Sequence, residues 1–185
     1  MRILLSSALL LVAVAMGACA HTTPHGVTAP SAPRALENDG PVAVEWTAPA
    51  GFSEIRGSSN RWEASRGNWV HELAEYLRDG VQARIGAGER VEILITDIRR
   101  AGDFEPGRGP QIDHVRIMRD IYWPRMTLEF SHHDAAGGRI AQGTRQLSDP
   151  SYLTSRIGPL TGTDPLRYEK AMIDDWLRKE FGPAR

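Results

Sequence analysis

Four acidic side chains near one predicted strand are the residues of this sequence best placed to do chemistry. Asp97, Asp103 and Glu105 lie close together at the end of the apolar run at residues 91–98, and Asp120 lies in a later segment that can pair with it. Two carboxylates a few ångström apart have pKa values that are pushed apart, so they can act as acid and base. Carboxylate oxygens also bind hard cations such as calcium. The pattern therefore indicates a candidate carboxylate site.

A structural role is the alternative for the same residues. Strict alternation along residues 91–98 places Asp97 on the same face as three aliphatic residues, next to a turn at residues 101–102. Its carboxylate would then accept hydrogen bonds from backbone groups of that turn. Asp120 would instead form an ion pair. The candidate ion-pair partners of Asp120 are Arg99, Arg119 and Arg125.

Other chemical signatures are weak or absent from the sequence. His132, His133 and Asp134 have metal-binding side chains, but successive strand residues point to opposite faces, so the two histidines cannot bind one ion within a strand. The sequence contains no GxSxG, HExxH, P-loop or GxGxxG motif. From the sequence we therefore expect no catalytic residue, no bound metal and no cofactor.

An aromatic segment interrupted by proline is a candidate contact edge. Tyr122 and Trp123 precede Pro124, which argues for a bulge or an exposed strand edge. Arg119 and Arg125 flank them, and aromatic and arginine side chains are enriched at protein interfaces. The alternative is burial of both rings in the core.

The first twenty residues read as an export signal. Arg2 precedes an apolar run at residues 3–16, which is too short to span a bilayer. Residues 16–19, Met-Gly-Ala-Cys, resemble a lipobox, which predicts lipidation of Cys19, the single cysteine; Ala20 after it favours the outer membrane. Ala18-Cys19-Ala20 also fits ordinary signal cleavage, which would leave a soluble periplasmic protein. An internal disulfide is excluded in both cases.

Composition divides the remainder into a tether and one domain. Residues 20–41 are rich in Thr, Pro and Ala without apolar periodicity, which predicts a flexible tether, and residues 42–185 have the length of a single domain. The formal net charge is −1 and no basic stripe is present, which argues against nucleic-acid binding.

Hydrophobic periodicity predicts strands and helices in the order β-α-β-β-β-α. The expected strands are residues 42–46, 91–98, 115–133 with a break at Pro124, and 139–147; the expected helices are residues 60–85 and 164–181. Asn60 with Glu63, and Asp164 with Pro165, are the expected helix starts. This order predicts an α+β two-layer sandwich with a mainly antiparallel four-stranded sheet and two helices.

Several short motifs resemble a family of bacterial envelope proteins catalogued as domain of unknown function 3016. They cover nearly all of the chain past the predicted tether, and Ala48 departs from the acidic residue expected before Pro49. The resemblance implies an exported single-domain protein and supplies no catalytic residue, ligand or partner. The motifs are ValGluTrpThr at 44–47, ThrAspIle at 96–98, AlaGlyAspPheGlu at 101–105, ArgAspIleTyr at 119–122, ProArg at 124–125, LeuArgTyrGluLys at 166–170 and AspTrp at 175–176.

Two functions are compatible with the sequence. The first is a non-enzymatic outer-membrane lipoprotein whose periplasmic domain binds another envelope protein or a cell-wall component. The second is a small periplasmic enzyme, or a cation- or ligand-binding protein, that uses the candidate carboxylate site. A pocket holding three of those carboxylates would favour the second function, and an exposed aromatic edge would favour the first.

Overall fold

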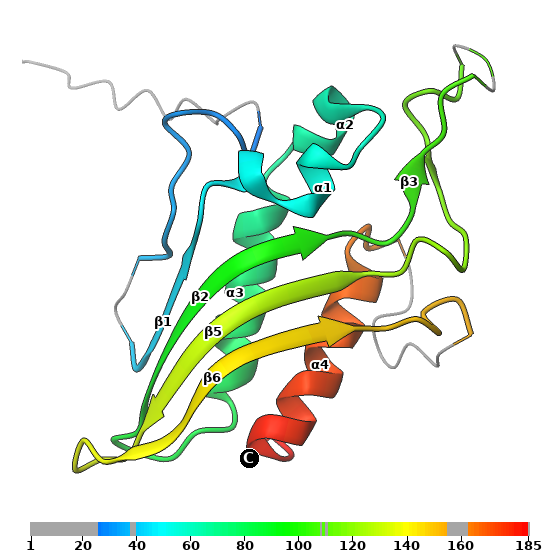
Figure 1. Cartoon of the computed structure of the whole chain (residues 1–185). Coiled ribbons are helices and arrows are strands. Elements are labelled where there is room, and N and C mark those ends of the chain that lie inside the picture. The colour runs from blue at the N-terminus through cyan, green and yellow to red at the C-terminus, as the bar shows by residue number, and fades with distance from the viewer. Residues whose placement is uncertain (1–25, 38–39, 108, 110, 155–162, 185) are drawn as a thin grey trace, which may run out of the picture.

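The computed structural model describes residues 26–37, 40–107, 109, 111–154 and 163–184 (Figure 1). Cys19 and the rest of the predicted signal lie outside these residues. The elements are, in order, β1 (Val42–Trp46), the 3-10 helix η1 (Pro49–Gly51), α1 (Ser53–Arg56), α2 (Arg61–Ser65), α3 (Trp69–Gln82), β2 (Arg90–Arg99), β3 (Asp103–Phe104), β4 (Arg116–Ile117), β5 (Arg125–His133), β6 (Arg139–Ser148) and α4 (Arg167–Phe181).

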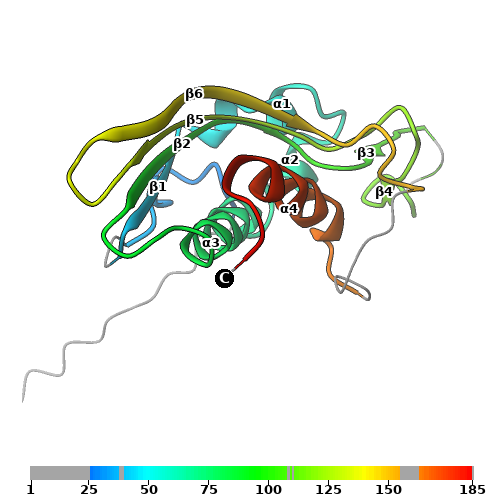
Figure 2. The ribbon, with the colours of Figure 1, turned by 90° about the horizontal axis from the view of Figure 1, so that it is seen from below.

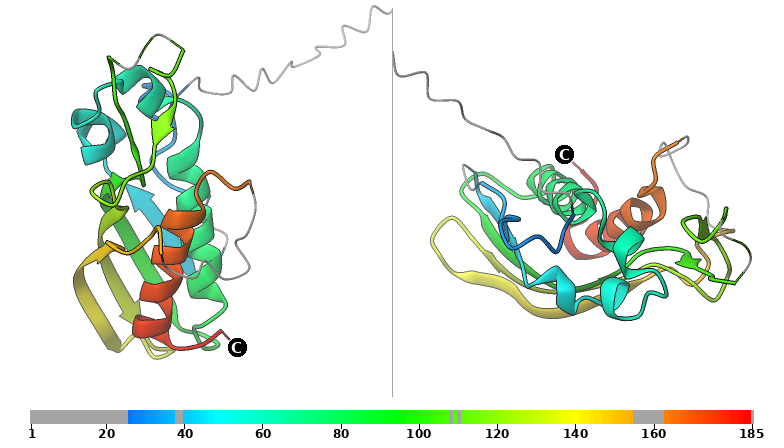
Figure 3. Two further views of the ribbon diagram at one scale, coloured as in Figure 1. Left: turned by 90° about the vertical axis from the view of Figure 1, so that its right-hand side faces the viewer. Right: turned by 90° about the horizontal axis from the view of Figure 1, so that it is seen from above.

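A four-stranded sheet in the order β1-β2-β5-β6 forms one layer, and α3 and α4 form the other. Figure 2 shows both helices beneath the arch of the sheet, and the right-hand view of Figure 3 shows them on the same side of it. The described helices α3 and α4 leave the opposite face of the sheet uncovered. We call this uncovered side the open face.

The α+β class is confirmed, but the predicted architecture was only partly right. β1 pairs with β2 in parallel, so the sheet is mixed, because α3 carries the chain back to the same end between the two strands. The described chain also has four α-helices in place of two, and β3 pairs with β4 in a second, two-stranded sheet. Each missed element is six residues or shorter, too short for a repeating apolar pattern.

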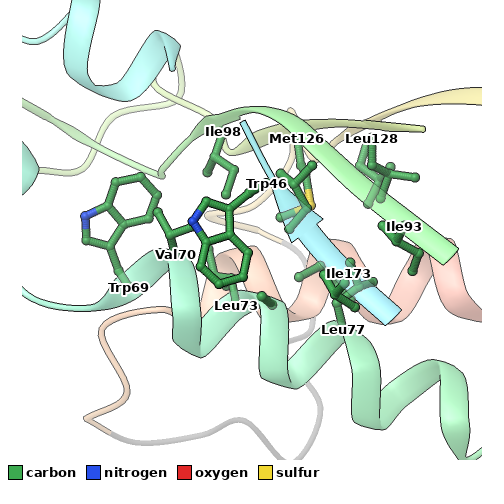
Figure 4. Packing of buried hydrophobic residues seen from close by; sticks show 14 of the residues in the cluster. Trp46, Trp69, Val70, Leu73, Leu77, Ile93, Ile98, Met126, Leu128 and Ile173 are labelled. Carbon is green, nitrogen blue, oxygen red and sulfur yellow. The ribbon is translucent and has the colours of Figure 1, made fainter. Parts of the chain in front are cut away.

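The hydrophobic core lies between the sheet and the two long helices. Alternate residues of β2 and β5 are buried, and they meet the apolar stripes of α3 and α4 (Figure 4). His132 lies on the buried face of β5, as the alternation predicted, and its ring packs against Phe181. The core residues labelled in Figure 4 are Trp46, Trp69, Val70, Leu73, Leu77, Ile93, Ile98, Met126, Leu128 and Ile173.

The helix predicted over residues 60–85 is two helices. Asn60 caps α2 as predicted, because its side chain accepts a hydrogen bond from the Glu63 amide at 3.2 Å. The chain then breaks at Gly67, whose φ of 81° is unfavourable for a residue with a side chain. α3 continues through Gly80, where a Cβ would collide with Leu177 of α4. Gly80 therefore allows the two long helices to pack closely.

The start of α4 lies two residues later than its capping signal indicated. Asp164 accepts a hydrogen bond from the Leu166 amide at 2.8 Å and forms an ion pair with Lys170 at 2.7 Å. The helix itself begins at Arg167. Partial burial raises the pKa of Asp164, but the bonds from Lys170 and Leu166 outweigh it, so the pKa is lowered overall. Asp164 therefore anchors the loop before α4 and its first turn.

Part of the stretch expected to be a tether packs against the domain. The Leu36 amide donates to Val44 O at 3.0 Å and the Trp46 amide donates to Arg34 O at 2.8 Å, so this segment pairs with the outer edge of β1. Val27 and Leu36 are buried. An apolar pocket of about 230 Å³ remains where the segment meets the start of α3. The folded domain therefore includes described residues upstream of Val42, the first of which is Gly26.

Candidate functional site

A β-bulge at Thr96 decides where Asp97 points. Ile95 pairs with Leu128 and Asp97 pairs with Thr127, so Thr96 is an extra residue without a partner on β5. The bulge returns Ile98 to the buried face and moves Asp97 to the side of the open face. The expectation that Asp97 shares a face with the aliphatic residues of β2 was therefore wrong.

Asp97 holds helix α1 against the end of β2. Its Oδ1 accepts a hydrogen bond from the Ser53 amide at 2.5 Å, and its Oδ2 accepts one from the Ser53 hydroxyl. The turn at residues 101–102, which we expected to supply these donors, does not. A carboxylate that accepts an amide bond in the first turn of a helix satisfies a donor that has no partner within the helix. The geometry therefore gives Asp97 a structural role.

We expect Asp97→Asn to lower the melting temperature by about 3–6 °C, because the amide cannot replace both acceptor bonds, which together contribute about 1–2 kcal/mol. Thermal unfolding followed by circular dichroism, with and without millimolar calcium, measures the effect. The shift should be the same in both conditions. If calcium raised the melting temperature of the wild type but not that of the variant, Asp97 would instead belong to a cation site.

Asp103 and Glu105 are bound by different arginines. Arg99 Nη2 lies 2.5 Å from Asp103 Oδ2, within the turn that leads to β3. The carboxylate of Glu105 accepts bonds from two guanidinium nitrogens of Arg119, each at 2.7 Å, and from the Tyr122 hydroxyl at 3.2 Å. Both carboxylates are therefore engaged in holding β3 and the loop after it to neighbouring segments.

Asp120, the fourth candidate, is exposed, and the described residues place no ion-pair partner beside it. No group of three or more His, Cys, Asp or Glu side chains in the described part of the chain is arranged to hold a metal ion. Three of the predicted carboxylates thus contact separate partners and Asp120 has no ion-pair partner among the described residues, so the geometry does not assemble the four into one site.

The two histidines point to opposite faces of β5, as the alternation predicted. His132 is buried and its Nε2 lies 3.0 Å from Glu89 Oε2, whereas His133 pairs with Arg139 at the end of the sheet. Asp134 accepts bonds from the Ala136 and Gly138 amides in the hairpin turn. These three residues therefore have separate structural roles.

The candidate contact edge is half-buried. Tyr122 O accepts a bond from the Gly102 amide at 2.8 Å, and Arg125 lies over the Trp123 ring at 5.6 Å. Arg119 O accepts a bond from the buried Tyr152 hydroxyl at 2.7 Å. The edge thus joins the small β3-β4 sheet to the main sheet, and its rings do not form a flat exposed surface.

Sequence reasoning missed a group of buried charges at the end of β2, which we call the buried charge cluster: Glu54, Arg100, Arg116 and Glu169. Glu54 is 2% exposed. Its Oε1 accepts bonds from Arg100 Nε at 3.1 Å and Nη2 at 3.0 Å, and also forms an ion pair with Arg116. Its Oε2 accepts the Arg100 amide at 3.0 Å. One carboxylate therefore joins α1, β4 and the end of β2.

Glu169 of α4 completes the cluster. It is 1% exposed, and its Oε1 accepts the Ala101 amide at 2.6 Å, whereas its Oε2 has no hydrogen-bond partner among the described atoms. Burial raises the pKa of Glu169, although the Ala101 amide and the positive charges of Arg100 and Arg116 oppose this. The neutral acid is therefore favoured over a wider pH range than for an exposed glutamate.

Aromatic rings and backbone carbonyls complete the surroundings of both arginines. Arg100 lies over the Trp69 ring at 4.5 Å and donates to Ala64 O, while Arg116 lies over the Phe104 ring at 4.7 Å. Burial lowers the pKa of Arg100 below its ordinary value, although the negative charge of Glu54 opposes this shift. The bonds of both guanidiniums are directed to protein groups, so the cluster joins elements of the fold and presents no open catalytic set.

Some signal for this cluster was present in the sequence. Ala101 and Glu169 belong to two of the motifs that carry the family resemblance, and Arg100 directly precedes the first of them. Glu54 lies in a segment without periodicity, and nothing in the sequence places it beside an arginine 46 residues away. Only the folded backbone brings these residues together.

The open face carries a shallow hollow of about 530 Å³ over β1, β2 and β5. In Figure 1 this face of the sheet lies in front of α3 and α4. Glu45, Glu92 and Glu129 are exposed on it, whereas Leu94 is half-buried between them. Side chains that line the hollow from this face are Ala43, Glu45, Glu92, Leu94, Glu129 and Ser131.

Comparison with known proteins supports the resemblance seen in the motifs. Neither the curated proteins nor the solved structures contain a match to the chain. No helix of the described residues has the length and apolar character needed to cross a membrane. The model of one protein family, described as a protein of unknown function (DUF3016), matches residues 40–179, from just before β1 to the last turn of α4. The chain therefore belongs to the DUF3016 family.

Proposed function

We propose that this protein is a non-enzymatic, exported accessory module that binds another envelope protein or a cell-wall component through the open face of its sheet. The observation that carries the proposal is the exposed surface of the four-stranded sheet, with a hollow of about 530 Å³, opposite the layer formed by α3 and α4. A hollow over hydrogen-bonded strands offers a binding partner a preorganised site.

The placement of the charged residues favours binding over catalysis. Asp97, Asp103 and Glu105 hold segments of the fold together, and the buried charge cluster does the same for α1, β4 and α4. A catalytic acid or base must instead reach a substrate atom from a pocket. The carboxylate enzyme or cation-binding protein therefore has no supporting geometry among these residues.

The proposed location is the periplasmic side of the outer membrane, with Cys19 as a lipid anchor. The support for it is the lipobox-like sequence at residues 16–19. Gly26 already pairs with Arg66 of the domain, so seven residue steps separate the proposed anchor from the folded domain. A chain of that length reaches at most about 25 Å. The domain would then lie close to the membrane surface.

Photo-crosslinking in living cells tests the proposed function. A crosslinking amino acid at Thr144 or Gln142 reports contacts of the open face, and the same residue at Asp79 or Asp175 reports contacts on the helix side. We expect one envelope component to be captured reproducibly from the two open-face positions and not from the two helix positions. Capture that is absent, or equal from all four positions, would contradict the proposal.

A further inference from the structure

We propose that the open face binds a cationic protein segment, in which lysine or arginine side chains flank an apolar side chain. The basic side chains would lie beside Glu45, Glu92 and Glu129, and the apolar side chain would rest on Leu94. This inference rests on the proposed function, because it assigns the chemistry of the partner that the open face would bind.

Strand register fixes the arrangement of these four residues. Leu94 pairs with Glu45 on β1 and with Glu129 on β5, so it lies between the two carboxylates in one row across the sheet. Strands are about 4.8 Å apart, so the backbones at Glu45 and Glu129 are roughly 10 Å apart. Glu92 lies in the next row, opposite Ser131. The surface is thus an apolar centre with carboxylates around it.

The three carboxylates are not neutralised by the described part of the chain. No ion pair within it involves Glu45, Glu92 or Glu129, and the one hydrogen bond to this group is from the Ser131 hydroxyl to Glu92 at 3.3 Å. Several carboxylates elsewhere in the described residues do have arginine partners, as in Arg145–Glu180 and Arg66–Glu63. The hollow of the open face therefore carries three carboxylates that have no ion-pair partner among the described residues.

Charge complementarity selects the occupant. Uncompensated carboxylates favour a positively charged partner and disfavour an anionic one, such as a phosphate-bearing glycan or lipid headgroup. A bare metal ion lacks a site here, because the described residues contain no group of three acidic or histidine side chains close enough to bind it. A segment with separated cations and an apolar residue matches both the carboxylates and the Leu94 surface.

The test measures binding of a synthetic peptide to the purified full chain. The probe carries two Lys-Leu-Lys triplets in a Gly/Ser background, and its control has glutamate in place of lysine. The test variant is Glu45→Gln, Glu92→Gln and Glu129→Gln together. The charge-matched control is Asp79→Asn, Asp120→Asn and Asp175→Asn, three exposed acids that do not line the hollow. Fluorescence anisotropy at low and high salt gives the dissociation constants.

We expect the open-face variant to bind the lysine peptide about tenfold more weakly, since three exposed ion pairs are lost. The control variant should differ from wild type by less than about twofold, and binding should weaken with salt. Equal weakening in both variants would show a general charge effect and overturn the inference. Unchanged affinity in the open-face variant, or a shift of the protein to dimers that excludes the peptide, would overturn it too.

The same substitutions in the crosslinking strain separate this inference from the proposed function. Loss of the adduct in the open-face variant, with an unchanged melting temperature, supports a cationic partner. An adduct that persists in this variant leaves the proposed function intact and refutes the partner chemistry. Absence of any adduct at Thr144 and Gln142 in the wild type refutes the proposed function itself.

Discussion

Replacing Glu54 with alanine is expected to lower the free energy of unfolding by about 3–5 kcal/mol. The substitution leaves the largely covered guanidiniums of Arg100 and Arg116 without their buried carboxylate, and removal of one partner from a buried ion pair typically costs this much. The side chain of Glu54 is 3% exposed, so water does not take its place readily. A loss of this size is a large part of the stability of a single domain.

Urea unfolding of three variants checks this expectation. Glu54→Gln retains an acceptor oxygen and should lose less stability than Glu54→Ala. Arg100→Met should cost less in the Glu54→Ala background than in wild type, because the two residues form one network. Asp175→Ala removes an exposed pair with Arg178 and should cost less than about 1 kcal/mol. A Glu54→Ala variant within 1 kcal/mol of wild type would show that the cluster contributes little to stability.

The main elements of the fold were predictable because their apolar patterns are long. Alternation identified β2 and β5, and a stripe of apolar residues identified α4. Each of these elements buries one face against the core, so the period of burial is visible in the sequence. The family resemblance, now confirmed over residues 40–179, was read instead from short motifs, several of which lie outside these elements.

Local departures from regular structure were not predictable from the periodicity. The bulge at Thr96 changes the face of every later residue in β2, and no pattern in the sequence marks it. Gly67 was included in a predicted helix because the capping pair Asn60 and Glu63 precedes it and the apolar pattern that begins at Trp69 follows it. The pairing of residues 34–36 with β1 depends on backbone hydrogen bonds, which any composition can form.

The candidate sites depended on contacts that are distant in the sequence. Nearness along the chain suggested that Asp97, Asp103 and Glu105 act together, but the bulge and the turn direct them to different partners. The buried charge cluster joins residues that are separated by 46, 62 and 68 positions along the chain. The open face likewise follows from the packing of both long helices on one side, which the order of elements alone does not determine.

The stability of the protein should also depend on pH through Glu169. Burial raises its pKa above the ordinary value of 4.5, so the folded protein holds this proton more tightly than the unfolded chain. The resulting stabilisation is present in full below pH 4.5 and is lost as the pH rises through the raised pKa. The proton would reside on Oε2, because Oε1 accepts the Ala101 amide.

Glu169→Gln separates this titration from all the others. Glutamine keeps an oxygen for the Ala101 amide and stays neutral, so the unfolding free energy of the variant relative to wild type should rise between pH 5 and pH 8. Groups that the substitution leaves unchanged cancel in the difference between the two proteins. Glu169→Ala loses the acceptor as well and should be destabilised by about 2–4 kcal/mol at both pH values. If the stabilities of wild type and Glu169→Gln change in the same way with pH, Arg100 and Arg116 stabilise the ionised Glu169 carboxylate enough to offset its burial, and the expectation is refuted.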